Sequence, residues 1–463
     1  MISLGAYDFE ANIHLFRWNE LNIVLDVNSG AIHIMDDIAY KVIDRMVESR
    51  GDISTAKQKL LKEFTDNEIE QVIIELESLH EQGALFSADE APRVDFSKMN
   101  IKAICLNVAH ACNMKCHYCF ASQGDFGMRP CLMTLETGKR AMDFLVEKSG
   151  KIVNLEVDFF GGEPLLAVDM LKELVKYCRQ KEKQHNKRFN FTLTTNATLL
   201  NDEIIKWVND NSISMILSLD GRKETNDCHR VLNNGQGTYD LIVPKIKKMV
   251  ASSPVSYYVR GTFTRKNLDF AYDLKHMIDL GFDCTSLEPA VGPDNGFSIL
   301  KEDLPQVLQE YERLTDVLLN EYVVGKDIHF FHYDLNLQRG PCLAKRISGC
   351  GAGIEYLVIT PEGDIYPCHQ FVGEEKFYMG NIYSGQVDNE VRIQFENNQL
   401  KDKECQKCWG RFFCGGGCHA GAYYANGDIS KPNDISCIMH KKRIEGAIYL
   451  NIQKHIIDKK MTQ

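Results

Sequence analysis

The sequence lacks long apolar runs. No stretch of its 463 residues approaches the roughly 18 uninterrupted apolar residues that a membrane-spanning helix needs. Its first eight residues contain neither a basic segment nor an apolar segment of the kind that begins an export signal. We therefore expect a cytoplasmic protein with no membrane partner, long enough for about two or three domains with cores of their own.

Residues 1–95 contain no cysteine, although the whole chain has 16. This segment has 8 basic and 19 acidic residues and so carries the entire net charge of −11, because the 45 basic and 45 acidic residues that follow cancel. The composition indicates a separate module and argues against binding to nucleic acid. Because disulfides are rare in the reducing cytosol, the 16 cysteines indicate metal ligation or thiol chemistry.

The pattern of this first module predicts a small winged-helix-like domain. The expected elements are strands over residues 21–27 and 31–35 around the turn signal Asn28-Ser29-Gly30, and helices over residues 38–46, near residues 57–64 and after a capping box at Thr65 and Glu68.

The middle of the chain alternates strand and helix patterns. Apolar β-runs occur at residues 101–108, 153–160, 189–194, 214–219, 257–263 and 284–287. Six such repeats with near-continuous apolar strands predict a parallel sheet covered by helices. Because six units are too few for a closed eight-stranded barrel, we expect a partial one, with its chemistry at the carboxyl ends of the strands.

A three-cysteine loop, Cys112-x-x-x-Cys116-x-Tyr118-Cys119-Phe120, follows the first of these strands. Three thiolates can hold three irons of a [4Fe–4S] cluster and leave the fourth iron open to a bidentate cosubstrate. A zinc site is the alternative, although zinc usually takes paired Cys-x-x-Cys units that close all four positions.

This loop resembles the signature of the radical S-adenosylmethionine (SAM) enzymes, in which an electron from the cluster cleaves SAM to a 5′-deoxyadenosyl radical. The resemblance implies that Cys112, Cys116 and Cys119 hold the cluster. The cofactor contacts that it implies are Tyr118 and Phe120 in the loop, Gly161, Gly162 and Glu163 of a GGEP motif near the methionyl amine, Ser218, and Arg230 at the methionyl carboxylate.

The C-terminal third resembles the SPASM domain of peptide-modifying radical enzymes, which holds two auxiliary [4Fe–4S] clusters. One cluster would take Cys405, Cys408, Cys414 and Cys437, and the other would take Cys350, Cys368 and Cys418. Either Cys342 or a substrate thiolate would complete the second set. A zinc ribbon is the alternative for the paired cysteines from Cys405 to Cys418. Gly415-Gly416-Gly417 lacks the Lys-Ser/Thr of a phosphate loop and is expected to allow close approach of the backbone to a cluster.

The whole arrangement most resembles the thioether-forming maturases of six-cysteine peptides, the SCIFF group. The resemblance implies an α/β enzyme with a winged-helix-like leader-peptide recognition element at residues 1–95, a partial (β/α)6 radical SAM barrel at 96–335 and a SPASM domain at 336–463. The enzyme would use SAM and three [4Fe–4S] clusters, and a flavodoxin or ferredoxin would supply low-potential electrons. It would join Cys thiols to acceptor carbons, plausibly of Thr, in a Cys-rich precursor peptide whose leader adds to an edge strand.

Two other functions remain open. A sulfatase-type maturase would oxidise Cys or Ser to formylglycine, but that family has Asp where this chain has His369, and it lacks the first 95 residues. His369 is itself a candidate base. A non-catalytic adaptor with zinc in the C-terminal cysteines is the second alternative. Of the other cysteines, Cys105, Cys178 and Cys284 are expected to be buried packing residues, whereas Cys131 and Cys228 have no assigned role beyond a structural one.

Overall fold

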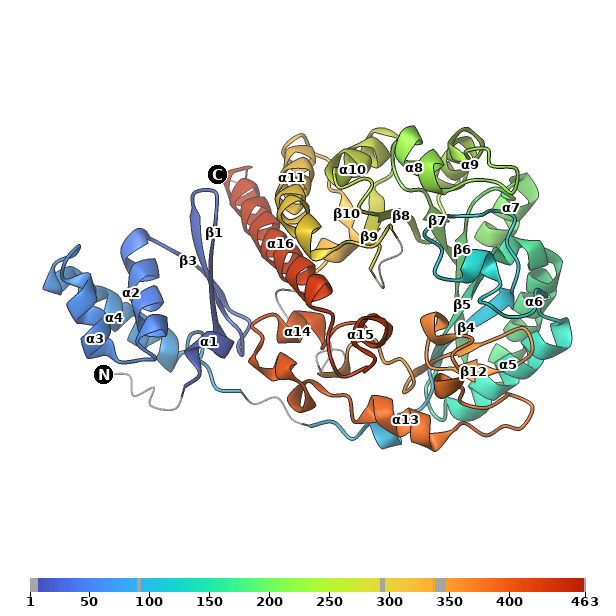
Figure 1. Cartoon of the computed structure of the whole chain (residues 1–463), viewed down its shortest axis with the longest axis horizontal. Coiled ribbons are helices and arrows are strands. Elements are labelled where there is room, and N and C mark those ends of the chain that lie inside the picture. Colours follow the sequence, from blue (N-terminus) through green and yellow to red (C-terminus); the bar gives the residue numbers. More distant parts are fainter. Residues whose placement is uncertain (1–6, 90–92, 292–295, 336, 338–346, 462–463) are drawn as a thin grey trace.

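The computed structural model describes residues 7–461 apart from 90–92, 292–295, 336 and 338–346, so the expected ligand Cys342 lies outside the described residues. A three-stranded sheet lies near the N-terminus, and a nine-stranded sheet forms the centre of the molecule (Figure 1). None of the described helices is both long enough and apolar enough to cross a bilayer.

The N-terminal module is a small antiparallel sheet packed with helices. Its elements are α1 (Phe9–Asn12), β1 (Ile13–Trp18), β2 (Leu21–Asp26), β3 (Ile32–Met35), α2 (Asp37–Glu48), α3 (Ile53–Leu60) and α4 (Asp66–Glu81), with strand order β1-β2-β3. The predicted hairpin and the capping box at Thr65 and Glu68 are confirmed. Three helices are present as expected, but the second begins and ends about four residues earlier than the predicted 57–64. The sequence reading missed β1, which pairs antiparallel with β2.

Both faces of this small sheet are buried. Val24 packs with the helices of the module, whereas Ile23 and Leu25 on the opposite face pack with Ile444 and Ile448 of α16 (Asp434–Met461). Figure 1 shows the blue hairpin lying beside this long red helix. The continuous apolar run in β2 therefore joins the first module to the C-terminal part of the chain.

The central sheet confirms the six predicted strands. They are β4 (Ala103–Ala109), β5 (Asn154–Gly161), β6 (Arg188–Thr195), β7 (Ile213–Ser218), β8 (Tyr257–Phe263) and β9 (Cys284–Pro289), all parallel and adjacent in chain order. Three short strands extend this sheet at its ends: β10 (His329–Phe330) pairs with β9, while β11 (Tyr356–Ile359) pairs with β4 and with β12 (Ile365–Tyr366). The sheet thus continues past residue 335, where the sequence suggested a domain boundary.

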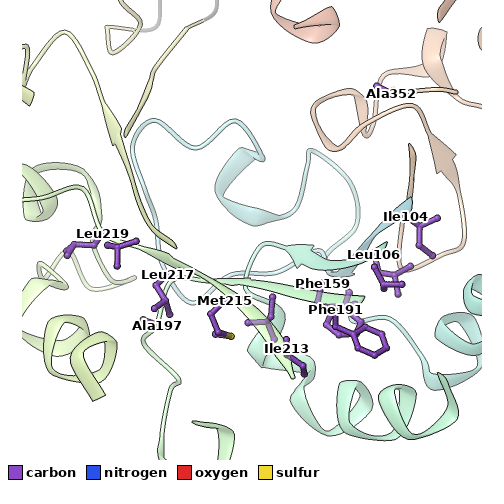
Figure 2. Packing of buried hydrophobic residues seen from close by; sticks show 14 of the residues in the cluster. Ile104, Leu106, Phe159, Phe191, Ala197, Ile213, Met215, Leu217, Leu219 and Ala352 are labelled. Carbon is purple, nitrogen blue, oxygen red and sulfur yellow. The ribbon is translucent and has the colours of Figure 1, made fainter. Parts of the chain in front are cut away.

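Helices cover one face of this sheet (Figure 1). They are α5 (Leu135–Lys148), α6 (Val168–His185), α7 (Asp202–Asp210), α8 (Lys223–His229), α9 (Tyr239–Ala251), α10 (Phe270–Asp279) and α11 (Leu304–Val323). Figure 2 shows Leu106, Phe159, Phe191 and Met215 among the apolar side chains buried in the main core.

The other face of the sheet is more polar than the sequence reading suggested. In β6, the buried Phe189, Phe191 and Leu193 alternate with the half-buried Asn190 and Thr192. The expected near-continuous apolar strand is therefore wrong for β6. The physical reason is that its second face lines the concave side of the sheet, where a site rather than a packed core is found.

The C-terminal part contributes α13 (Asn389–Glu396), α14 (Arg411–Cys414), α15 (His419–Asn426) and α16, which packs along α11. Short 3₁₀ helices complete the described structure: η1 (Phe96–Lys98), η2 (Ser122–Gly124), η3 (Pro164–Ala167), η4 (Lys301–Asp303), η5 (Phe331–Tyr333), η6 (His369–Phe371), η7 (Glu375–Phe377), η8 (Leu400–Asp402) and η9 (Glu404–Lys407).

Candidate functional site

The three-cysteine loop leaves the carboxyl end of β4, as expected for parallel α/β sheets. The Cys112 sulfur accepts a hydrogen bond from the Met114 amide at 3.4 Å. Burial raises the pKa of the Cys112 thiol and raises that of Cys116 to about 12. Without a metal, these two cysteines are therefore neutral thiols. A bound cation would lower their pKa values and favour the thiolate form.

Two glycines at the end of β5 support this loop through backbone contacts. The Gly162 amide donates to the Ala109 carbonyl at 2.8 Å, and the Glu163 amide donates to Ala111 at 2.9 Å. A Cβ atom on Gly162 would lie 2.1 Å from the Ala111 oxygen, and Gly161 has a φ of +130°. Only glycine allows the two chain segments to come this close.

The Glu163 side chain is buried and ties the ends of two strands together. Its carboxylate accepts hydrogen bonds from the Leu165 amide at 3.0 Å, the Thr195 hydroxyl at 2.8 Å and the Asn196 amide at 2.8 Å. Burial nevertheless raises the pKa of this carboxyl group. The structure therefore gives Glu163 a positioning role, and its contact with the methionyl amine of SAM stays a prediction.

A buried group of three polar side chains lies beside the cysteine loop. The Tyr118 hydroxyl donates to Asp220 at 2.7 Å, and the Arg230 guanidinium donates to the Tyr118 oxygen at 3.2 Å. Asp220 also accepts from the Thr262 amide of β8 at 3.0 Å, which fixes its carboxylate. The sequence reading assigned no role to Asp220, although its place two residues after the end of β7 was a usable signal.

Arg230 fits the predicted contact with an anionic cosubstrate. It is buried, and its Nε atom has no hydrogen-bond partner among the described residues. Burial alone would lower its pKa, but the neighbouring Tyr118, Cys116 and Asp220 raise it above the ordinary value. A permanently charged donor beside the cysteine loop suits a carboxylate such as the methionyl group of SAM. Ser218 ends β7, and its cofactor contact stays a prediction.

His369 lies against the aromatic side chains near the loop. Its ring centroid is 5.4 Å from that of Phe120 and 5.1 Å from that of Phe160, which is near the carboxyl end of β5. Burial lowers the pKa of His369 to about 4, so the imidazole is neutral at physiological pH. A neutral imidazole can accept a proton, and the structure brings this one, together with the neighbouring Cys368, to the part of the sheet that carries the cysteine loop.

The concave face also carries titratable groups that the sequence reading missed. Cys105 is buried, as expected, but it lies near Asp158 and Tyr356 rather than among apolar side chains alone. Burial and, secondarily, Glu156 raise the pKa of Asp158 to about 6. The alternation of polar and apolar residues from Asn154 to Phe159 in β5 was the signal that could have placed Asp158 on this face.

Several auxiliary cysteines lie near one another. Burial raises the pKa of Cys437 to about 12, with further contributions from Cys414, Cys405 and Cys408. Burial also raises the pKa of Cys368, with further contributions from Cys418 and Cys350. Their role as ligands of two clusters stays a prediction.

A lysine side chain and backbone amide groups near these cysteine sets would stabilise an anionic group. Lys403 is buried, its Nζ atom has no hydrogen-bond partner among the described residues, and it lies near Cys405, Cys414 and Cys350. Gly415, Gly416 and Gly417 all have positive φ angles. Burial raises the pKa of Cys414, while hydrogen bonds from the Gly416 and Gly417 amides lower it. The glycine run therefore brings backbone amides to a sulfur, as expected.

The spacing of these sulfurs also bears on the zinc alternative. A tetrahedral zinc ion with Zn–S bonds of about 2.3 Å holds its sulfur ligands about 3.8 Å apart. Among the described residues, no three of the expected iron ligands have sulfur atoms within 4.8 Å of one another. These described sulfurs therefore do not form a ready-made tetrahedral zinc set in this structure.

Comparison with known families agrees with this geometry. The radical SAM superfamily model matches residues 106–266, and the SPASM model, an iron-sulfur cluster-binding domain, matches residues 350–409. The chain carries a radical SAM domain followed by a SPASM domain. The two matched segments contain the cysteine loop and the start of the auxiliary cysteine sets, respectively.

The radical SAM and SPASM regions are similar to those of several proteins of known sequence. An uncharacterized protein of Methanocaldococcus jannaschii is 28% identical over 66% of this chain and 94% of its own length. The cysteine-type anaerobic sulfatase-maturating enzyme of Clostridium novyi is 25% identical over 66% of this chain and 84% of its own length. The mycofactocin maturase MftC of Mycolicibacterium smegmatis is 26% identical over 72% of this chain and 82% of its own length.

Solved structures show the same fold. Native anSMEcpe with bound AdoMet matches with a TM-score of 0.63 at 21% identity, covering 76% of this chain and 99% of that chain. Streptococcus suis SuiB bound to S-adenosylmethionine matches with a TM-score of 0.55 at 16% identity. The SuiB match covers 92% of this chain and 98% of that chain, so it includes at least part of the N-terminal module.

The assigned iron ligands predict a definite iron content. After anaerobic reconstitution, the protein should contain about twelve irons per chain, and Cys112→Ala should remove about four of them. Iron and acid-labile sulfide analysis measures both values. Cys228→Ala changes an exposed cysteine that has no proposed metal role and should leave the count unchanged. Stoichiometric zinc in place of iron would contradict the assignment.

Proposed function

We propose that this protein is a radical SAM maturase that forms thioether cross-links in a ribosomally made, Cys-rich precursor peptide of the SCIFF type. The observation that carries the proposal is that three features lie close together: the cysteine loop, His369, and the set that contains Cys368. Phe120 of the loop and Phe160 of β5 both lie against the His369 ring. A peptide thiol held by the second auxiliary set would therefore lie near the place where a hydrogen atom is removed.

The residues present fit the groups that the two domains imply. Cys112, Cys116 and Cys119 would hold the cluster that binds SAM, with Arg230 at the SAM carboxylate. Two auxiliary clusters would use the two cysteine sets. When bound, SAM and the cluster held by the three-cysteine loop together supply a carbon radical that can remove hydrogen from an unactivated carbon.

The protein's own residues would position the peptide and manage its proton. Forming one thioether removes a hydrogen atom from the acceptor carbon and a proton and an electron from the thiol side, so the peptide loses two hydrogens. His369 would accept the thiol proton, because its ring lies against Phe120 of the cysteine loop and the residue follows Cys368 directly in the chain. The electron would pass to the auxiliary clusters that the two cysteine sets would hold, and Lys403 lies buried near Cys405, Cys414 and Cys350 of those sets.

The N-terminal module offers an edge strand for docking the peptide. β3 is a terminal strand of the small sheet, and its residue Ile34 is 52% exposed. An added strand would gain main-chain hydrogen bonds along β3, and exposed side chains such as Ile34 would contribute specificity. The structure of SuiB bound to precursor peptide SuiA also matches this chain, with a TM-score of 0.52.

Formylglycine formation is the second candidate function. The Clostridium relative is named a sulfatase-maturating enzyme, and anSMEcpe has been solved with bound peptides. The His369 imidazole and the acidic N-terminal module favour the thioether reading instead.

A direct assay separates the two candidates. The reconstituted enzyme, incubated anaerobically with SAM, a low-potential reductant and a six-cysteine precursor peptide, should lower the peptide mass by two hydrogens per bridge. Fragmentation should locate a Cys linked to another residue, and the Cys112→Ala enzyme should produce no change. Conversion of a Cys or Ser in a sulfatase peptide, with the precursor peptide left intact, would instead support formylglycine formation.

Docking at β3 predicts a selective loss of affinity. Ile34→Asp should raise the Kd or KM for the full precursor at least about tenfold, because it places a charge on the apolar edge. SAM cleavage without peptide should stay unchanged. Leu61→Asp alters another exposed apolar residue of the same module, 48% exposed, and serves as the control. Equal effects of the two variants would exclude docking at this edge.

His369 as the base predicts a specific rate effect. His369→Ala should lower the cross-linking rate about 100-fold or more, which is the usual contribution of a positioned base. SAM binding and iron content should match those of the unaltered enzyme. Full cross-linking rates in this variant would rule out the role.

A further inference from the structure

A group of three potential metal ligands lies outside the iron sites proposed above. His110, Cys131 and Glu362 each place one ligand atom within 4.8 Å of the other two. The Cys131 thiol donates a hydrogen bond to a Glu362 oxygen at 3.0 Å. Cys131 follows His110 by 21 positions, and Glu362 follows Cys131 by 231 positions, so the fold rather than local sequence brings the three residues together.

His110 supplies a second, independent observation. Its side chain is fully buried, and neither ring nitrogen has a hydrogen-bond partner among the described residues. The Phe126 ring at 5.1 Å provides an apolar contact but accepts no strong hydrogen bond. A buried imidazole without a partner is costly, and a ligand at one of its nitrogens would remove that cost.

The backbone around the three residues is held in place. The His110 amide donates to the Cys131 carbonyl at 2.9 Å, and the adjacent residues Ala109 and Leu132 form an antiparallel bridge. Glu362 lies in the turn between β11 and β12, where its carbonyl accepts from Asn381 at 3.2 Å. A site formed by ordered backbone loses little entropy when an ion binds.

We propose that His110, Cys131 and Glu362 bind one zinc ion, with water in the fourth position. Neutral imidazole, thiolate and carboxylate together balance the charge of Zn²⁺. The proton now shared between Cys131 and Glu362 passes to solvent as the metal–sulfur bond forms, and no electron is transferred. Ligand atoms of tetrahedral zinc lie about 3.3 to 3.8 Å apart, so small side-chain movements close the site.

The donor set distinguishes zinc from other common ions. Calcium and magnesium prefer oxygen ligands alone, whereas a mixed nitrogen, sulfur and oxygen set suits zinc. The ion would act as a clamp rather than a catalyst. It would join both ends of the segment that contains the cysteine loop, residues 110–131, to the β11–β12 turn. It would thereby connect the radical SAM region to the SPASM region.

Metal analysis of the fully reconstituted protein tests this site. The protein is incubated anaerobically with excess zinc sulfate, unbound metal is removed by gel filtration, and zinc and iron are counted. We expect about one zinc per chain in addition to the full iron content. Zinc-edge X-ray absorption, which does not detect the iron, should show one sulfur at about 2.3 Å and nitrogen or oxygen at about 2.0–2.1 Å.

Two variants and a control decide where the zinc is. Cys131→Ser and Glu362→Gln should each reduce retained zinc at least about tenfold at unchanged iron content, whereas Cys228→Ser should retain it. Glu362 is exposed, so its variant keeps the test valid if Cys131→Ser does not fold. No retained zinc in the unaltered protein, a shell of four sulfurs, or unchanged zinc in the Glu362 variant would overturn the proposal.

Discussion

The close approach of two backbone segments supports the whole candidate site. Gly161 and Gly162 at the end of β5 contact the chain between Ala109 and Ala111 so closely that any side chain would collide with it. A third glycine, Gly124, packs at the same place: a Cβ there would lie 2.6 Å from that of Cys112 and 3.0 Å from the Gly162 Cα. The three glycines thus let the backbone pack closely around Cys112, and Glu163 then fixes this arrangement to β6.

The N-terminal module is joined firmly to the segment that carries auxiliary cysteines. The buried Arg411 guanidinium donates to the Ala11 carbonyl at 2.7 Å and to the side chains of Asn12 and Asn28 at 2.6 Å. Beside it, the His14 ring stacks on Trp409 at 3.6 Å. Both Trp409 and Arg411 lie between Cys408 and Cys414 in the sequence. A peptide docked on this module would therefore have a fixed position relative to the auxiliary set.

Local patterns predicted the elements that depend on local physics. The capping box at Thr65 and the six β-runs correspond to the observed structure because capping and strand burial are encoded by neighbouring residues. The long helix α16 was missed because its apolar residues face two places: Ile444 and Ile448 pack with the small sheet, whereas Ala447 and Leu450 pack in the main core. They do not form one stripe.

Contacts between distant residues limited the prediction of the site. Cysteine spacing grouped the three cysteines of the loop that follows β4, whereas the division of the auxiliary cysteines came from the resemblance, since Cys414 and Cys418 are close in sequence but were expected in different sets. The interaction of Tyr118 with Asp220, by contrast, depends on where a loop meets a strand end 102 residues away. The grouping of His110, Cys131 and Glu362 likewise arises only when β11 pairs with β4. No periodicity in a single sequence contains that information.

Two buried basic side chains lie beside the cysteines that are predicted to bind metal. Lys403 and Arg230 are both buried, and each has a polar nitrogen without a hydrogen-bond partner among the described residues. Burial lowers the pKa of Lys403, whereas Asp220 and Tyr118 already lie beside Arg230, so nearby anions would stabilise the charged form of the lysine in particular. The neighbouring cysteines supply that negative charge once they ionise to bind metal. Metal binding would therefore stabilise the surrounding fold as well as supply the chemistry, because it converts neutral thiols into partners for cations already buried beside them.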